Sequence, residues 1–105
     1  MTSDELLAGL PGEALVRQGL ADVTDERRTV PAYVVAIARP RLDRAGLLTQ
    51  RASTLLVDFE NPERELYRLL RAEGGDAYSR YNALLRELAS FESALDSRLR
   101  RSSHE

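Results

Sequence analysis

An unbroken apolar run from Val30 to Ala38 is the feature that most constrains the fold, because so apolar a segment has to be buried. Within it, Val30, Tyr33, Val34 and Ile37 recur at the spacing of one helical face. The remaining positions are apolar too, which predicts a central helix rather than one on the surface. The β-branched content of the run leaves a buried strand as the alternative.

Local signals bound this run on both sides. Thr29 can cap a helix start and Pro31 fits its first turn. Pro40 cannot continue a helix interior, so we expect the helix to end near Ala38 or Arg39. After it, residues 42–48 favour one more short helix interrupted by a glycine, whereas 54–59 fit either a helix or a strand.

The other segments also indicate helices. Asn61-Pro62 is typical of a helix cap followed by proline in the first turn, and the pair of glycines at 74–75 ends that helix. Asp76 then caps the last helix, which carries a seam with spacings of three and four residues. We therefore predict one domain, residues 1–105, with an all-α fold: a compact bundle of about five helices with a long C-terminal helix and a frayed polar tail at 101–105. The seam of the last helix consists of Tyr81, Leu84, Leu88, Phe91 and Leu95.

Composition excludes several classes of protein. The chain is 43% hydrophobic and 30% charged, which is typical of a globular protein. It has no cysteine, so disulfides, thiol catalysis and zinc–thiolate sites are excluded. The start of the chain is acidic where a signal peptide is basic, and the longest apolar run is far below the roughly 20 residues of a membrane span. We expect a cytoplasmic protein with no membrane association.

Side chains for catalysis are few. Besides cysteine, the chain lacks lysine, and its one histidine, His104, lies one residue from the C-terminus. The carboxylates Glu60, Glu63 and Glu65 cluster at a predicted helix start, where negative charge interacts favourably with the helix dipole. The sequence contains no Glu-x-x-His pattern that would suggest a metal site. We predict no catalytic residue, no cofactor and no metal. An enzyme that uses carboxylates and tyrosines is the weakest alternative.

Charge is unevenly distributed along the chain. Residues 1–26 carry six acids and one arginine, whereas residues 27–51 carry six arginines and one acid, although the whole chain has a net charge of −2. A proline-stiffened basic loop can bind phosphates, so a nucleic-acid-associated regulator that uses the 27–51 segment is the alternative function. We do not expect nucleic acid as the partner, because the preceding acids Asp22, Asp25 and Glu26 can pair with these arginines. The candidate basic patch is Arg39, Arg41, Arg44 and Arg51.

Tyrosines and arginines also gather near the glycine pair at 74–75. Tyr67, Tyr78 and Tyr81 are joined there by Arg71 and Arg80. This grouping predicts either a ligand or peptide pocket or a set of tyrosines packed between two helices. Three further positions, 64, 68 and 71, place arginines on one face of the preceding helix.

The end of the last helix is the candidate interface. A helix from Asp76 to Leu99 is about 36 Å long, whereas a compact domain of this size is about 33 Å across. Its apolar stripe persists to the end, so we favour a homodimer over a monomer, with cover by a short N-terminal helix around Leu6 and Leu7 as the alternative. We therefore predict a non-enzymatic helical adaptor or accessory protein that acts through a protein partner. The candidate interface residues are Leu88, Phe91, Leu95 and Leu99.

Overall fold

The computed structural model describes residues 1–103, and in this range every regular element is a helix. The all-α prediction is therefore confirmed, but the described chain forms seven helices rather than about five, because the short segments before and after the central helix are helical as well. In chain order they are α1 (Ser3–Leu7), α2 (Glu13–Thr24), α3 (Val30–Ile37), α4 (Arg39–Arg44), α5 (Gln50–Leu56), α6 (Pro62–Glu73) and α7 (Ala77–Ser103).

The central helix is α3, as the apolar run predicts. The Thr29 side chain caps it by accepting a hydrogen bond from the Ala32 amide at 3.2 Å. Val34 and Val35 are fully buried, because α2 packs on one side of α3 and α6 packs on another. Burial all round the helix is why its sequence carries no polar face, and the helical rather than the strand interpretation is correct.

Helix α2 approaches α3 so closely that the contact requires a glycine. A Cβ atom built on Gly19 would lie 2.3 Å from the carbonyl oxygen of Pro31 and 2.4 Å from a methyl carbon of Val35. Backbone therefore meets backbone at this crossing. The sequence shows Gly19 inside a helical pattern without indicating which element it faces.

Helix α3 ends just before Pro40, close to the predicted end at Ala38 or Arg39. Helix α3 stops at Ile37, and α4 begins at once at Arg39 with Pro40 in its first turn, where an amide hydrogen is not needed. Gly46, at φ +74°, lies just beyond the end of α4. The short helix predicted at 42–48 thus lies earlier in the chain.

The next two helices resolve the open alternatives. Helix α5 begins at a cap in which the Thr49 hydroxyl accepts from the Ala52 amide at 3.1 Å, so residues 54–56 are helical and the strand alternative is wrong. Helix α6 begins at Pro62, as predicted. Asn61 does not cap it through its side chain and instead adopts a left-handed φ of 47°, a conformation that asparagine tolerates.

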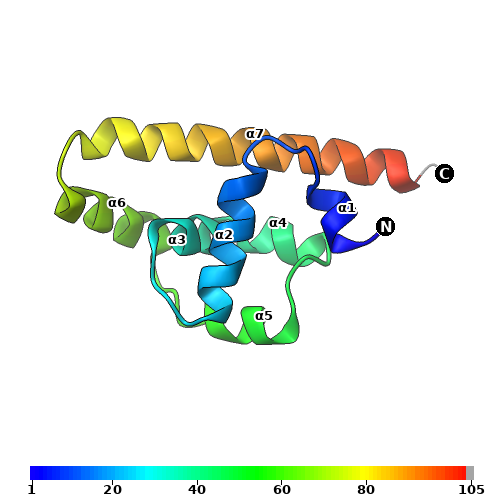
Figure 1. The fold of residues 1–105 in the computed structure, drawn as a ribbon, viewed down its shortest axis with the longest axis horizontal. Coiled ribbons are helices and arrows are strands. Elements are labelled where there is room, and N and C mark those ends of the chain that lie inside the picture. Colours follow the sequence, from blue (N-terminus) through cyan, green and yellow to red (C-terminus); the bar gives the residue numbers. More distant parts are fainter. Residues whose placement is uncertain (104–105) are drawn as a thin grey trace.

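The long C-terminal helix is confirmed, and it runs the length of the molecule along one side (Figure 1). Asp76 begins it by accepting from the Ser79 amide at 3.0 Å. Its 27 residues measure about 40 Å, against a longest molecular dimension of 47 Å. Residues 101–103, predicted to fray, belong to this helix, while the rest of the predicted tail, including His104, lies outside the described residues.

Candidate interaction surfaces

The predicted interface at the end of α7 is largely internal. Leu88, Phe91 and Leu95 are 3%, 0% and 0% exposed in the single chain, and Leu99 is half-buried. The premise of an uncovered C-terminal stripe is therefore wrong. The domain is elongated rather than spherical, so other parts of the chain reach this end of α7, and Leu88, Phe91 and Leu95 do not require a second copy for their burial.

Helix α1 is one of the elements that cover the end of α7. Cover by this N-terminal helix was the alternative to a homodimer. Its Leu6 and Leu7 are buried. Arg98 of α7 donates from Nη1 to the carbonyl oxygens of Glu5, Leu6 and Ala8 at 3.1, 3.0 and 2.5 Å. A cation is well placed there, because the last carbonyls of a short helix lack partners within the helix.

The predicted basic patch is divided between internal contacts and solvent. Arg39, Arg41 and Arg44 share α4, but Arg41 forms an ion pair with Asp96 of α7. Arg51, on α5, donates to the carbonyl oxygen of Thr24 at 3.2 and 3.1 Å. Within the described residues, Arg39 and Arg44 form no hydrogen bond or ion pair, so half of the patch is engaged in holding the fold together.

Among the acids expected to neutralise that patch, Asp22 has another role. Asp22 is 4% exposed and accepts hydrogen bonds from the Thr29 hydroxyl at 2.6 Å and the Gln18 amide at 2.9 Å. These two bonds hold the pKa of the Asp22 carboxyl below its ordinary value. Only Glu26 meets an arginine of the patch, at 3.8 Å from Arg51.

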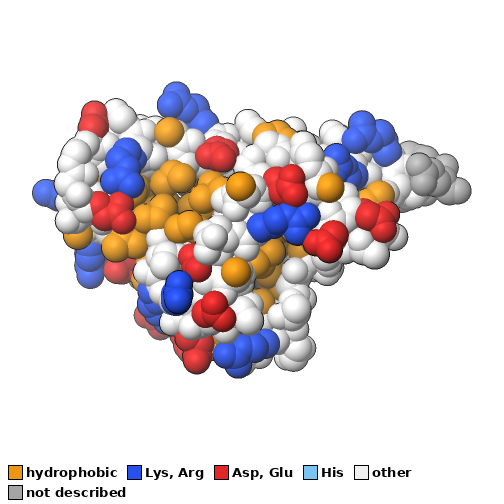
Figure 2. Space-filling model, in the orientation of Figure 1, with side chains coloured by type: hydrophobic (Ala, Val, Ile, Leu, Met, Phe, Trp, Pro, Cys, Tyr) orange, Lys and Arg blue, Asp and Glu red, His pale blue; other side chains and the backbone are white. Residues whose placement is uncertain are grey.

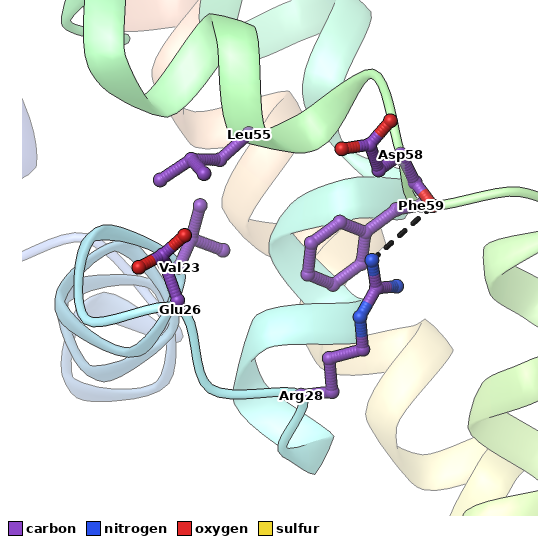
Figure 3. Close-up of a pocket in the computed structure, with 6 residues that line it drawn as sticks. All are labelled: Val23, Glu26, Arg28, Leu55, Asp58 and Phe59. Atoms are coloured by element: carbon purple, nitrogen blue, oxygen red, sulfur yellow. Dashed lines mark hydrogen bonds between the residues drawn. The ribbon is translucent and has the colours of Figure 1, made fainter.

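A small pocket lies where the end of α2 faces α5 (Figure 3). Val23 and Leu55 form its apolar side, and Phe59 forms the opposite side. The Arg28 guanidinium lies 4.2 Å from the centre of the Phe59 ring and donates to the Asp58 carbonyl oxygen at 3.3 Å. The pocket, which Glu26 also lines, measures about 220 Å³, below the range of about 300–1,000 Å³ that is usual for ligand sites. Because its arginine is already bound, we do not assign it a ligand.

The corner between α6 and α7 carries the predicted group of tyrosines. Tyr67 and Tyr81 pack edge to face, with ring centres 5.7 Å apart, as the packing interpretation expects. Tyr78 differs, because it is 67% exposed. It lies with Tyr67 and Arg71 around a shallow hollow of about 600 Å³. Arg80 takes no part in this hollow, since it pairs with Glu73 at 2.8 Å. We call Tyr67, Arg71 and Tyr78 the corner surface.

Next to the corner, three arginines follow one face of α6. Leu66 and Leu70 are fully buried on the opposite side of this helix, which directs positions 64, 68 and 71 toward solvent. Together with Tyr67 these arginines surround a second hollow of about 300 Å³. We call Arg64, Arg68 and Arg71 the arginine ridge.

Exposure changes along α7 in the direction opposite to our expectation. Tyr78 is exposed, Tyr81 and Leu84 are half-buried, and the stripe is fully covered from Leu88 to Leu95. Figure 2 shows hydrophobic side chains gathered between α7 and α3, with acidic and basic side chains interspersed around them. The incompletely covered part of the stripe is thus the beginning of α7, next to the corner surface.

Other kinds of site find no support in the described part of the chain. Residues 1–103 contain no group of three or more acidic or histidine side chains placed to hold a metal ion. Within the same range, no helix combines the length and the apolar character needed to cross a membrane.

Fold and surface together define a small all-α domain with an exposed tyrosine–arginine corner. Comparison of the chain with protein families, curated proteins and solved structures finds no match.

Proposed function

We propose that this chain is a non-enzymatic adaptor or accessory protein that binds a protein partner through the corner surface. The observation that carries the proposal is Tyr78, a large aromatic side chain that is 67% exposed beside a hollow lined by Tyr67 and Arg71. Tyrosine and arginine are among the residues that contribute most to binding energy at protein interfaces. The chemistry of the sequence supports a non-enzymatic role, since it offers no cysteine or lysine and one histidine at position 104.

The corner is also partly ordered before any partner arrives. The edge-to-face contact with Tyr81 holds the Tyr67 ring, and Asp76 fixes the start of α7 two residues before Tyr78. A surface whose side chains are already held loses less conformational entropy on binding. We propose Tyr78 as the residue that inserts into the partner, with Tyr67 and Arg71 at its side.

Two earlier expectations remain proposals of lower rank. A homodimer through the end of α7 lacks its original reason, because Leu88, Phe91 and Leu95 are buried within one chain. A nucleic-acid regulator that uses the 27–51 segment retains Arg39 and Arg44 as accessible cations, while Arg41 and Arg51 have internal partners. A cytoplasmic location likewise remains a proposal.

Site-specific photocrosslinking tests the corner surface directly. The photoreactive residue benzoylphenylalanine replaces Tyr78 in cells that produce the protein, and irradiation then traps whatever lies against that position. Val57, at the end of α5 and 60% exposed, receives the same residue as a matched control. We expect a discrete crosslinked protein from position 78 and none of the same mass from position 57.

Two results would overturn the proposal. One is the absence of any discrete product from position 78. The other is an identical set of products from both positions, because that pattern reports random collision at exposed sites rather than a defined interface.

A further inference from the structure

We propose that the arginine ridge, Arg64, Arg68 and Arg71, binds an acidic segment of a protein partner. This inference rests on the proposed function and specifies the chemistry of the partner. It uses a surface next to the corner, and Arg71 belongs to both. A partner whose residue covers Tyr78 can therefore continue along α6 over the ridge.

The backbone of α6 fixes the spacing of the ridge. Arg64, Arg68 and Arg71 are separated by about 6 Å and about 4.5 Å along the helix axis. In an extended peptide, every second side chain lies on the same side, about 6.6–6.8 Å apart. Carboxylates at alternate positions of a peptide therefore come close to the axial spacing of Arg64 and Arg68, and arginine can hold a carboxylate through two hydrogen bonds.

The ridge has little counter-charge of its own. Within the described residues, Arg64 and Arg71 form no ion pair. Arg68 meets Glu65 at 3.5 Å, with 67% of the arginine side chain exposed, so the contact is weak. Other arginines of the chain are more firmly paired: Arg17 lies 2.7 Å from Asp4 and 2.8 Å from Glu13. The three ridge cations are thus available to an external anion.

The surroundings of the ridge favour a peptide over a nucleic acid. Glu63 precedes the ridge and Glu73 follows it on the same helix. Because Glu73 is paired with Arg80 at 2.8 Å, the uncompensated negative charge that a longer phosphate backbone would meet is that of Glu63. The whole chain also has a net charge of −2, which repels a long polyanion. A short acidic segment fits between the two glutamates, and the Tyr67 ring in the hollow offers it an apolar contact.

Fluorescence anisotropy tests the inference with a defined probe. The probe is a fluorescein-labelled peptide of about six residues in which Glu alternates with Ser, so that it presents three carboxylates to the three arginines of the ridge. A peptide in which Gln replaces every Glu is its uncharged counterpart. We expect binding of the acidic peptide at about 50 mM NaCl, a marked loss at about 150 mM NaCl, and no binding of the Gln peptide.

Two variants with equal net charge separate the ridge from general electrostatics. The first carries Arg64→Gln, Arg68→Gln and Arg71→Gln. The control carries Arg39→Gln, Arg44→Gln and Arg86→Gln, three arginines that form no ion pair within the described residues. We expect the ridge variant to lose at least about ten-fold in affinity for the acidic peptide and the control less than about two-fold. Circular dichroism of both variants verifies that the helices remain.

Three results would overturn the inference: no binding of the acidic peptide at low salt, equal losses in the two variants, or tighter, ridge-dependent binding of a single-stranded oligonucleotide of similar length. The crosslink at position 78 distinguishes this failure from failure of the proposed function. A product at position 78 that persists in the ridge variant would support the contact at Tyr78 and would count against an acidic partner. Absence of that product in the unmodified background counts against the corner, whereas the peptide titration still decides the ridge.

Discussion

Asp22 connects α2 to the cap of α3 through one buried carboxylate. It lies in α2 and accepts from Gln18 one turn earlier and from Thr29, whose hydroxyl also caps α3. A buried carboxylate without such donors would be costly. Here the donors stabilise its charged form, and this lowers the pKa of Asp22.

The lowered pKa makes a signed prediction for stability against pH. The folded-state pKa lies below the unfolded value of about 3.9, so the contribution of Asp22 is complete above that pH and is lost as the pH falls through the folded-state pKa. We expect Asp22→Asn to destabilise the protein near neutral pH and to differ progressively less from wild type below about pH 4. Urea titrations over a pH series measure this, with the exposed Asp43→Asn as the control for loss of one negative charge. A difference that stays constant down to about pH 2 contradicts the prediction.

At the scale of elements, the crossing of α2 and α3 depends on Gly19. Replacing glycine by alanine inside a helix ordinarily stabilises it, by roughly 0.5–1 kcal/mol. At Gly19 the added methyl group would clash with the backbone of Pro31, which has no freedom to move away. The tertiary contact therefore reverses the sign that helix propensity predicts.

We expect Gly19→Ala to lower the free energy of unfolding by about 3 kcal/mol, the upper end of the usual cost of overpacking. Gly46→Ala is the matched comparison, because it adds the same methyl group with nothing within 4 Å but at a φ of +74°. Its cost should be about 1–2 kcal/mol, from backbone strain alone. Denaturant titration of both variants checks that Gly19→Ala is the more destabilising of the two. An unchanged or increased stability of Gly19→Ala would show that the helices do not approach this closely.

Helix α1 stays on α7 partly through one side chain. Five residues are too few for a helix to persist in isolation, so α1 depends on burial of its leucines and on the bonds from Arg98 to its last carbonyls. Arg98→Met retains much of the aliphatic stem and removes the donors. We expect faster hydrogen exchange confined to α1 and the chain around it, measured by mass spectrometry on fragments. Arg101→Met, at an exposed site on the same helix, should leave exchange unchanged, and equal protection of α1 in both variants would contradict the role of Arg98.

At the scale of the whole molecule, burial of the α7 stripe within one chain means that a mutation in the stripe affects stability rather than dimerisation. At a dimer interface, Leu95→Glu would produce a folded monomer. Leu95 is instead 0% exposed in the single chain, so the variant removes a core leucine, at about 2–5 kcal/mol, and buries a carboxylate in its place. Against a usual total stability of about 5–15 kcal/mol, we expect a severely destabilised protein.

Circular dichroism melting and sedimentation equilibrium measure this outcome together. Val57→Glu, at a 60% exposed position, is the control and should change stability by less than about 0.5 kcal/mol. If the Leu95→Glu protein melted like wild type but sedimented with half the mass of wild type, the dimer interface would again be supported.

The local signals of the sequence determined where the main helices begin and how long they run. Thr29 accepts from an amide three residues later, Pro62 fits the first turn of its own helix, and the spacing of Leu66 and Leu70 marks a buried face whatever lies against it. Such signals are short in range, so the all-α class, the central α3 and the long α7 follow from them. The tyrosine group and the three arginines of α6 could also be predicted, because they share a helix or a turn.

Only the tertiary structure decided which surfaces remain open. The cover of Leu95, the pairing of Arg41 with Asp96 and the clash that reserves position 19 for glycine all join residues that are distant in the chain or lie on different helices. An apolar stripe has the same sequence whether α1 or a second copy buries it, and an arginine has the same spacing whether its acid lies in this chain or in a partner. Exposure is a property of the packed molecule, so the sequence pattern alone could not show that Tyr78 is open to solvent and that Leu95 is covered.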